Sequence, residues 1–326
     1  MRSGAGRTQV LLGDIGGTNA RFAVLIDGEL AKVEQVMVAD HASFDAAVAT
    51  FLAGQRPRPD IGAAVLAIAG PVRGEFCAIT NSPWMIDAGE LCSTFGLTSV
   101  HLINDFEAVA RSLPRLREAD LFPLGEGKAQ AGAPMLVLGP GTGFGAAALI
   151  DPDGRAIPVA TEAGHATLPS ASRRDDAIID HLRQRFGHVS VERVISGPGL
   201  ENLYQAIAAV DDAPVPQRNP NEITEAAIAG TCPISRMALE TFCAMLGTVA
   251  GNLALGFCAL GGVYIAGGIA PRIAAFLARS EFRERFEGKG RFRSYLEAVP
   301  TNIIVHPYPT FVGLKALSEA SDDATS

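Results

Sequence analysis

The sequence is short of positive charge. It has 27 Lys and Arg against 35 Asp and Glu, a formal net charge of −8. A protein that holds nucleic acid neutralises phosphates with clustered Lys and Arg. We therefore expect no nucleic-acid partner, although a nucleotide can still be held by backbone N–H groups and a Mg²⁺ ion.

Paired cysteines are missing as well. The five cysteines are odd in number and form no C-x-x-C pair, which predicts neither a disulfide framework nor a zinc knuckle. Most lie in apolar surroundings and fit small core residues in a reducing compartment. The apolar run before Asp14 is shorter than the roughly 7–15 residues of a signal peptide. We expect a cytoplasmic protein.

One long stretch has no charged residue. It lies between Glu240 and Arg272, and by length alone it is enough to cross a bilayer. Seven glycines interrupt it, and helical spacing gives way to a Gly-Gly break and the short apolar run VYIAGG. The pattern favours a core helix that leads into a buried strand over a membrane span, so no membrane partner is expected.

What the sequence has in plenty is length and glycine. Its 326 residues exceed the limit of roughly 250–300 for one core, so two domains are expected. It has 35 glycines where average usage gives roughly 23. Strand and helix patterns alternate, and residues 114–134 form a loop-rich crossing. We expect DDAPVPQRNPNE to be a loop and the tail SEASDDATS to be frayed.

Two glycine-rich turns stand out. VLLGDIGGTNARFAVL and MLVLGPGTGFGAAALI each place such a turn between two apolar strands. This similarity predicts two related α/β halves, each with a phosphate-facing turn, around a ligand cleft. Glycine lets backbone N–H groups converge on phosphate oxygens; the alternative is an ordinary hairpin turn. The candidate nucleotide-binding residues are Gly13, Asp14, Ile15, Gly16, Gly17, Thr18, Asn19, Gly139, Gly141, Thr142 and Gly143.

The sequence excludes two other kinds of phosphate-binding loop. Gly141, Gly143 and Ala146 fit G-x-G-x-x-A, but that fingerprint must open a helix. Here AAALI and DPDG predict a strand that ends in a hairpin turn. No G-x-x-x-x-G-K-[ST] sequence occurs. The predicted phosphate turn is therefore strand–turn–strand, with Asp14 placed to hold Mg²⁺ through water.

Asp105 follows the apolar run VHLI, at the carboxyl end of a predicted strand. Open α/β sheets present ligand groups at that end. A carboxylate there could accept the proton of an attacking hydroxyl. The alternative is a helix N-cap before FEAVARSL, a position where Asp is strongly preferred.

Six motifs in order carry a family resemblance: GDIGGTNARFAV, INDFEAVA, LGPGTGFGAA, TEAGHATLP, HVSVERVISGPGL and VYIAGGIAPR. Over roughly residues 9–315 the chain resembles the bacterial glucokinase family, of the actin–hexokinase–heat-shock chaperone superfamily. The resemblance implies an α/β fold of two actin-like (ribonuclease H-like) domains flanking a ligand cleft. A small domain would hold residues 1–115 plus about 305–326, and a large domain residues 116–304. It also implies transfer of the ATP γ-phosphate to the 6-hydroxyl of glucose, with Mg²⁺, by a homodimer.

The same resemblance assigns roles to residues. Asp105 matches the family's catalytic base, and Gly267 and Gly268 match its adenosine-facing turn. The residues that match sugar ligands, Asn81 most weakly, are Asn81, Asn104, Asp105, Glu162, His165 and Glu192.

These residues also have plainer interpretations. Glu162 and His165 could be two metal ligands, but no third is nearby in the sequence. His165 alone would usually be a structural histidine. Glu192 could be a first-turn Glu favoured by a helix dipole after Ser190. The Gly267–Gly268 pair could be a plain strand-to-helix turn.

Two departures narrow the classification. The chain lacks the Cys-rich zinc motif of the related repressor–kinase group, and it has no N-terminal helix-turn-helix. The alternatives are a kinase for another hexose or an amino sugar, or a non-catalytic actin-like sugar sensor or filament subunit. A retained Asp105 with a full set of carboxylates argues against the non-catalytic alternatives.

Overall fold

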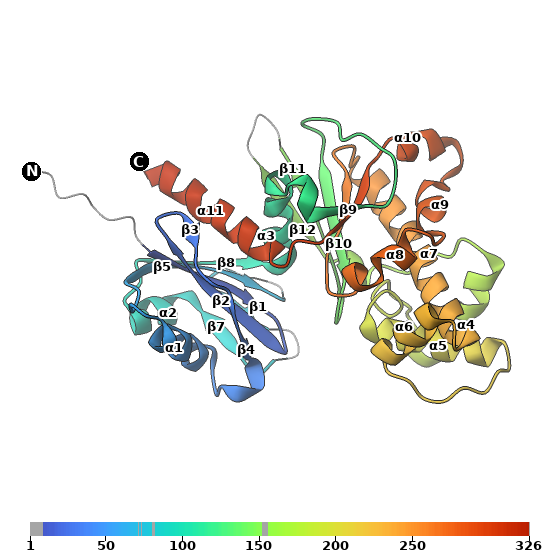
Figure 1. Cartoon of the computed structure of the whole chain (residues 1–326), viewed down its shortest axis with the longest axis horizontal. Helices are drawn as coiled ribbons and strands as arrows, with labels where there is room; N and C mark the ends of the chain where they lie inside the picture. Colours follow the sequence, from blue (N-terminus) through green and yellow to red (C-terminus); the bar gives the residue numbers. More distant parts are fainter. Residues whose placement is uncertain (1–8, 71, 73, 80–81, 152–155, 326) are drawn as a thin grey trace, which may run out of the picture. The chain divides into compact units, whose positions relative to one another are not determined.

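Two six-stranded sheets organise the chain, each within its own compact unit. Unit 1 combines Met1–Arg115 with Pro307–Ser326, and unit 2 is Leu116–His306. The computed structural model describes residues 9–325 except 71, 73, 80–81 and 152–155, and only the backbone of residues 321–325. The last helix therefore belongs to the unit in which the chain starts (Figure 1).

Unit 1 is a sheet with helices packed against both faces. Its elements are β1 (Gln9–Ile15), β2 (Asn19–Ile26), β3 (Glu29–Leu30), β4 (Glu34–Met37), α1 (Phe44–Gly54), β5 (Ile61–Ile68), β6 (Phe76–Ala78), β7 (Met85–Asp87), α2 (Ala88–Phe95), β8 (Ser99–Asn104), α3 (Asp105–Ser112) and α11 (Pro309–Thr325). The strand order is β3-β2-β1-β5-β8, with β4 also paired to β2. Strand side chains alternate between faces, so Leu11 and Ile15 join the core under α1 and α2, while Val10 and Leu12 join the core under α3 and α11.

Unit 2 repeats this topology and adds helices. Its main elements are β9 (Leu121–Pro123), β10 (Met135–Pro140), β11 (Phe144–Ile150), β12 (Ile157–Thr161), α4 (Arg173–Phe186), α5 (Gly197–Val210), α6 (Pro220–Ala229), α7 (Pro233–Gly256), β13 (Val263–Ile265), α8 (Ala274–Leu277), α9 (Phe282–Glu287), α10 (Arg293–Glu297) and β14 (Thr301–Ile304). The order is β12-β11-β10-β13-β14-β9. β1 in unit 1 and β10 in unit 2 each pair antiparallel with the strand that follows and parallel with a later central strand, β5 or β13. The predicted pair of related α/β halves is confirmed.

The long uncharged stretch is helix α7 followed by strand β13. In the described part of the chain, α7 is the one helix long and apolar enough to cross a membrane, and 72% of its most apolar window is buried. A Cβ on Gly247 would lie 2.1 Å from the Phe282 carbonyl oxygen, and one on Gly251 would lie 2.4 Å from that of Phe286. The glycines thus let the backbone of α9 approach α7 directly, as expected of a core helix.

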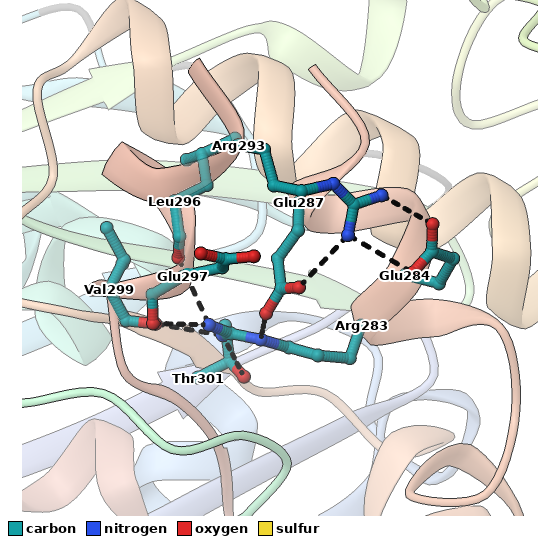
Figure 2. Close-up of polar contacts among 8 residues, drawn as sticks. All are labelled: Arg283, Glu284, Glu287, Arg293, Leu296, Glu297, Val299 and Thr301. Carbon is teal, nitrogen blue, oxygen red and sulfur yellow. Dashed lines mark hydrogen bonds and ion pairs between the residues drawn. The ribbon is translucent and has the colours of Figure 1, made fainter. Parts of the chain in front are cut away.

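Arg283 on α9 ties together the segments that lead into β14 (Figure 2). All five of its N–H donors are used, and the four terminal ones reach their acceptors at 2.8–3.1 Å. The acceptors are the carbonyls of Leu296, Glu297 and Val299, the Thr301 hydroxyl and the Glu287 carboxylate. Figure 2 also shows Arg293 reaching Glu284 and Glu287 nearby.

One sequence prediction about a loop was wrong at its end. The predicted loop DDAPVPQRNPNE ends at Asn219, because Asn219 and Glu222 form a reciprocal capping box with Pro220 at the first helical position, and α6 begins there. The tail SEASDDATS continues α11 to Thr325, and its fraying stays a prediction.

Candidate functional site

The first glycine-rich turn joins β1 to β2. The Gly16 N–H donates to the Asn19 carbonyl at 3.0 Å, which closes the turn. The Thr18 side chain is exposed, and Gly16 and Gly17 are only partly buried. This strand–turn–strand form is the one predicted, and it leaves the backbone of residues 16–18 accessible to a ligand.

Three residues assigned to this turn, Gly13, Asp14 and Ile15, lie inside β1 instead, and two of them are buried. Ile15 is fully buried, and Gly13 is buried beside it. A Cβ on Gly13 would lie 2.7 Å from the Leu66 Cδ2 atom on the neighbouring strand β5. Packing between the two strands therefore accounts for this glycine, and any contact of either residue with a nucleotide would have to come from the backbone.

A chain of polar side chains braces this turn. The Arg21 guanidinium donates to Asp14 Oδ2 at 3.1 Å and to Gln35 Oε1 at 3.2 Å, and Gln35 Nε2 donates to Asn19 Oδ1 at 3.0 Å. The sheet register explains these contacts, since Asp14 pairs with Arg21 across β1 and β2, and Arg21 pairs with Gln35 across β2 and β4. Asp14 and Asn19, at the two ends of the turn, are thereby linked through side chains.

The Asp14 carboxyl lies in a mixed electrostatic setting. Burial raises its pKa, and the charge and hydrogen bond of Arg21 act against that rise. One carboxylate oxygen holds Arg21, while Oδ1 accepts no hydrogen bond from the described residues. Mg²⁺ is commonly held by one or two carboxylates together with waters and substrate phosphates. The donor set at Asp14 fits such an ion held through water.

Asp105 is the first residue of α3, directly after β8. Asn104 is the N-cap: its Oδ1 accepts from the N–H groups of Phe106 at 3.0 Å and Glu107 at 3.3 Å. Asp105 Oδ1 also accepts from the Phe106 N–H, at 2.9 Å. The capping alternative for Asp105 is therefore wrong, because the residue before it fills that position. Asp105 is half-buried at the carboxyl end of a parallel strand.

The second glycine-rich turn joins β10 to β11 and is tied to Glu192. The Gly141 N–H donates to the Gly143 carbonyl at 2.8 Å. The Phe144 N–H donates to Glu192 Oε2 at 2.9 Å, and a Cβ on Gly143 would lie 2.5 Å from that same oxygen. A side chain at residue 143 would displace the carboxylate from this position. Glu192 lies in a turn before α5, so its interpretation as a first-turn helix residue is wrong.

The segment that carries Glu162 and His165 packs against this turn. A Cβ on Gly164 would lie 2.3 Å from the Phe144 carbonyl oxygen, and the Glu192 N–H donates to the Gly164 carbonyl at 2.9 Å. His165 Nε2 lies 3.8 Å from Glu162 Oε2, with both side chains about 70% exposed (68% and 73%). Such exposure does not fit a buried structural histidine. Glu162, His165 and Glu192 therefore lie on two neighbouring segments of unit 2.

Two more segments reach the second turn. Gly267 has a φ of +84°, and a Cβ there would lie 2.4 Å from the Pro140 carbonyl oxygen. The Gly197 N–H, at the start of α5, donates to the Gly141 carbonyl at 2.8 Å. Gly268 and Gly141 have open space where a Cβ would be. Gly139 and Pro140 are buried, and Thr142 is exposed.

Each unit therefore gathers its own predicted residues. Unit 1 holds the first turn, Asn104 and Asp105, and unit 2 holds the second turn, Glu162, His165, Glu192 and the Gly267–Gly268 turn. Asn81 lies outside the described residues.

Comparison with known proteins gives the family. A family model described as Glucokinase matches residues 11–321. The glucokinase of Paramagnetospirillum magneticum is 46% identical over 310 residues, covering 94% of this chain and 97% of that protein. The chain belongs to the glucokinase family. Another glucokinase, from Nitrobacter hamburgensis, is 43% identical over 309 residues, covering 94% and 96%.

Solved structures place the glucokinase family on the same fold. A glucokinase from an Antarctic psychrotroph is 34% identical with a TM-score of 0.86, over 96% of this chain and 99% of that one. A ROK family glucokinase from Streptomyces griseus, in complex with glucose and AMPPNP, is 20% identical with a TM-score of 0.67, over 95% and 98%. The predicted α/β, actin-like fold and the family resemblance are confirmed.

The sequence motifs of the glucokinase family did not identify every residue that shapes the site. Arg21 and Gln35, which link Asp14 to Asn19, were not predicted. Arg21 lies within the motif GDIGGTNARFAV, so its position was a signal, but Gln35 becomes its neighbour only through the pairing of β2 with β4.

Proposed function

We propose that this protein is a glucokinase, an enzyme that transfers the γ-phosphate of ATP to the 6-hydroxyl of glucose. The observation that carries the proposal is Asp105 at the carboxyl end of β8, in a chain of the glucokinase family. Relatives along nearly the whole chain are named glucokinases, and a protein of the same fold was solved with glucose and AMPPNP.

In this mechanism Asp105 is the general base. It accepts a hydrogen bond from the sugar 6-hydroxyl and takes its proton as the oxygen attacks the γ-phosphorus. The hydrogen bond from the Phe106 N–H to Asp105 Oδ1 helps to hold the carboxylate. Asn104 is proposed to contact neighbouring sugar hydroxyls.

The other sugar ligands are proposed to be Glu162, His165 and Glu192. Carboxylates suit a neutral sugar because each accepts hydrogen bonds from hydroxyl groups. A site with such groups rejects analogues that lack the matching hydroxyl, because its polar groups would be left unpaired. The close packing of Gly164 on the second turn keeps these three residues in fixed relation to it.

The phosphates of ATP are proposed to bind the two glycine-rich turns. Backbone N–H groups of Gly16, Gly17 and Thr18 would contribute in unit 1, and those of Gly141 and Thr142 in unit 2. Gly267 and Gly268 are proposed to face the adenosine. Mg²⁺, held by Asp14 through water, would neutralise phosphate charge.

We also propose that the enzyme is a cytoplasmic homodimer and that units 1 and 2 are its small and large domains. The cysteine pattern supports a reducing compartment, and the family typically forms homodimers. Sedimentation velocity at micromolar concentration tests the dimer, since a monomer of 34.0 kDa would contradict it.

A coupled ADP-release assay tests the substrate. With Mg²⁺ and ATP, glucose is expected to give the highest kcat/KM in a panel that also contains mannose, fructose, glucosamine and N-acetylmannosamine. A higher value for an amino sugar would replace glucose as the substrate. No turnover with any sugar would exclude the kinase function.

Substitution of Asp105 tests the base. Asp105→Asn is expected to lower kcat by about 10²–10⁴-fold in a protein that stays folded, because a general base contributes that much to the rate. Glu107→Gln on the same helix is the matched control, since Glu107 pairs with Arg111 at 3.0 Å and has no proposed role in the reaction. Wild-type activity in Asp105→Asn would contradict the assignment.

A further inference from the structure

The helix that begins at Asp105 packs directly on the helix that ends the described chain. α3 and α11 lie side by side in unit 1 (Figure 1). A Cβ on Gly313 of α11 would lie only 1.7 Å from the carbonyl oxygen of Ala108 and 2.7 Å from its carbonyl carbon. The corresponding distance at Gly247, another tightly packed glycine, is 2.1 Å. The two helices approach so closely only because residue 313 has no side chain.

Ala108 is one helical turn after Asp105, so displacement of its carbonyl moves the start of the helix. The first turn of α3 is tied to the Asn104 cap and to the Asp105 carboxylate through the N–H groups of Phe106 and Glu107. Because Asp105 Oδ1 is bonded to the backbone of this turn, its carboxylate follows the position of α3.

Both helices of this contact are packed into the core of unit 1. On α11, Phe311 and Leu314 are fully buried, and they pack in one core with Leu12 of β1, Val65 of β5 and Ile103 of β8. On α3, Ala108 and Ala110 are also fully buried. The sheet thus fixes α11, and α11 in turn sets the position of α3.

We propose that Gly313 is a positioning residue for the reaction: the direct contact of α11 with the Ala108 carbonyl sets the place of Asp105. The proposal deepens the proposed function and rests on it. A methyl group at residue 313 needs at least 3.0 Å from its neighbours instead of 1.7 Å, so α3 has to shift by more than an ångström. A misplacement of about 1 Å can cost about 10²-fold in rate.

The test is Gly313→Ala in the full-length protein. We expect kcat to fall by about 10²-fold, while KM for ATP stays within about twofold, as for a defect in the chemical step. Amides of residues 106–112 are expected to exchange faster with solvent. Assays are run well below the melting temperature of each variant, so that all molecules counted are folded.

Two glycine variants separate positioning from general destabilisation. Gly247→Ala places a Cβ 2.1 Å from the Phe282 carbonyl oxygen in unit 2, a crowded helix contact of the same kind that does not involve α3. It is expected to lower the melting temperature and to keep wild-type kcat. Gly54 lies at the end of α1 with nothing within 4 Å of an added Cβ. Gly54→Ala should lower neither the melting temperature nor kcat.

Several outcomes would overturn the proposal. Wild-type kcat in folded Gly313→Ala would overturn it. An equal loss of kcat in Gly247→Ala would also overturn it. If Gly313→Ala does not fold, Leu314→Ala takes its place, because it loosens α11 without crowding Ala108. Wild-type kcat in that variant would equally reject the proposal. Turnover by the wild type and its loss in Asp105→Asn test the proposed function separately.

Discussion

Burial raises the pKa of the Asp14 carboxyl, and Arg21 only partly opposes the rise. A group whose pKa is higher in the folded than in the unfolded chain binds its proton more tightly when folded. Its contribution to stability is therefore fully present below the unfolded value near 3.8 and is lost as pH rises through the folded pKa. Above its folded pKa, the ionised Asp14 makes the fold less stable than it is at acid pH.

We therefore expect Asp14→Asn to be at least as stable as the wild type near pH 7, with an advantage that shrinks toward about pH 4. Activity should fall by about 10–100-fold, the usual effect of losing an outer-shell partner of a metal. Thermal unfolding across this pH range measures the stability, and steady-state kinetics measure the activity. Asp60→Asn, at an exposed residue of the same unit, is the control; a less stable Asp14→Asn near pH 7 would contradict the prediction.

The sequence identified single residues where the signal was local. Asp14 and Thr18 lie within one short motif, and the turn around them has the predicted form. The sequence offered Asp105 as a candidate N-cap of α3, but Asn104 fills that position; both are strong capping residues, so the preference alone does not choose between neighbours. The contact of Arg21 with Gln35 depends on strand register between residues 14 apart, which no local pattern specifies.

At the scale of elements, Arg283 holds the segments that lead into β14 by hydrogen bonds to their backbone carbonyls. Lys cannot supply five donors in a fork, so Arg283→Lys leaves buried carbonyls without hydrogen bonds. We expect the free energy of unfolding to fall by about 1–3 kcal/mol. Urea denaturation measures it.

Arg293→Lys is the matched control, because Arg293 pairs with Glu284 at side-chain exposures of 42% and 64%. Pairs this exposed contribute about 0–1 kcal/mol. An equal loss of stability in the two variants would show that the five hydrogen bonds of Arg283 in Figure 2 contribute no more than the exposed ion pair of Arg293.

The elements themselves were predicted where apolar periodicity was strong, as in β1, β2, β10, β11 and α7. The start of α6 was missed although its signal is local: Asn219, Pro220 and Glu222 have the spacing of a capping box with proline at the first position.

For the whole molecule, the repeated topology of the two units followed from the repeated glycine-rich turns. The packing of α11 on α3 had no sequence signal of its own, since Gly313 and Ala108 lie far apart in the sequence. Only contacts between distant segments specify which glycine is needed for close approach. For this reason the sequence predicts the residues of the site better than the residues that hold them in place.

The proposed sugar ligands come from both units, Asn104 and Asp105 from unit 1 and Glu162, His165 and Glu192 from unit 2. A ligand that binds only the native state stabilises it by about 2.7 kcal/mol at a hundred times its Kd. We expect glucose to slow amide exchange around residues 104–107 and around residues 162–165 together, with the same concentration dependence. Sorbitol at equal concentration is the control. Protection confined to one unit would mean that the other contributes no sugar ligand, and the residues assigned there would have to be withdrawn.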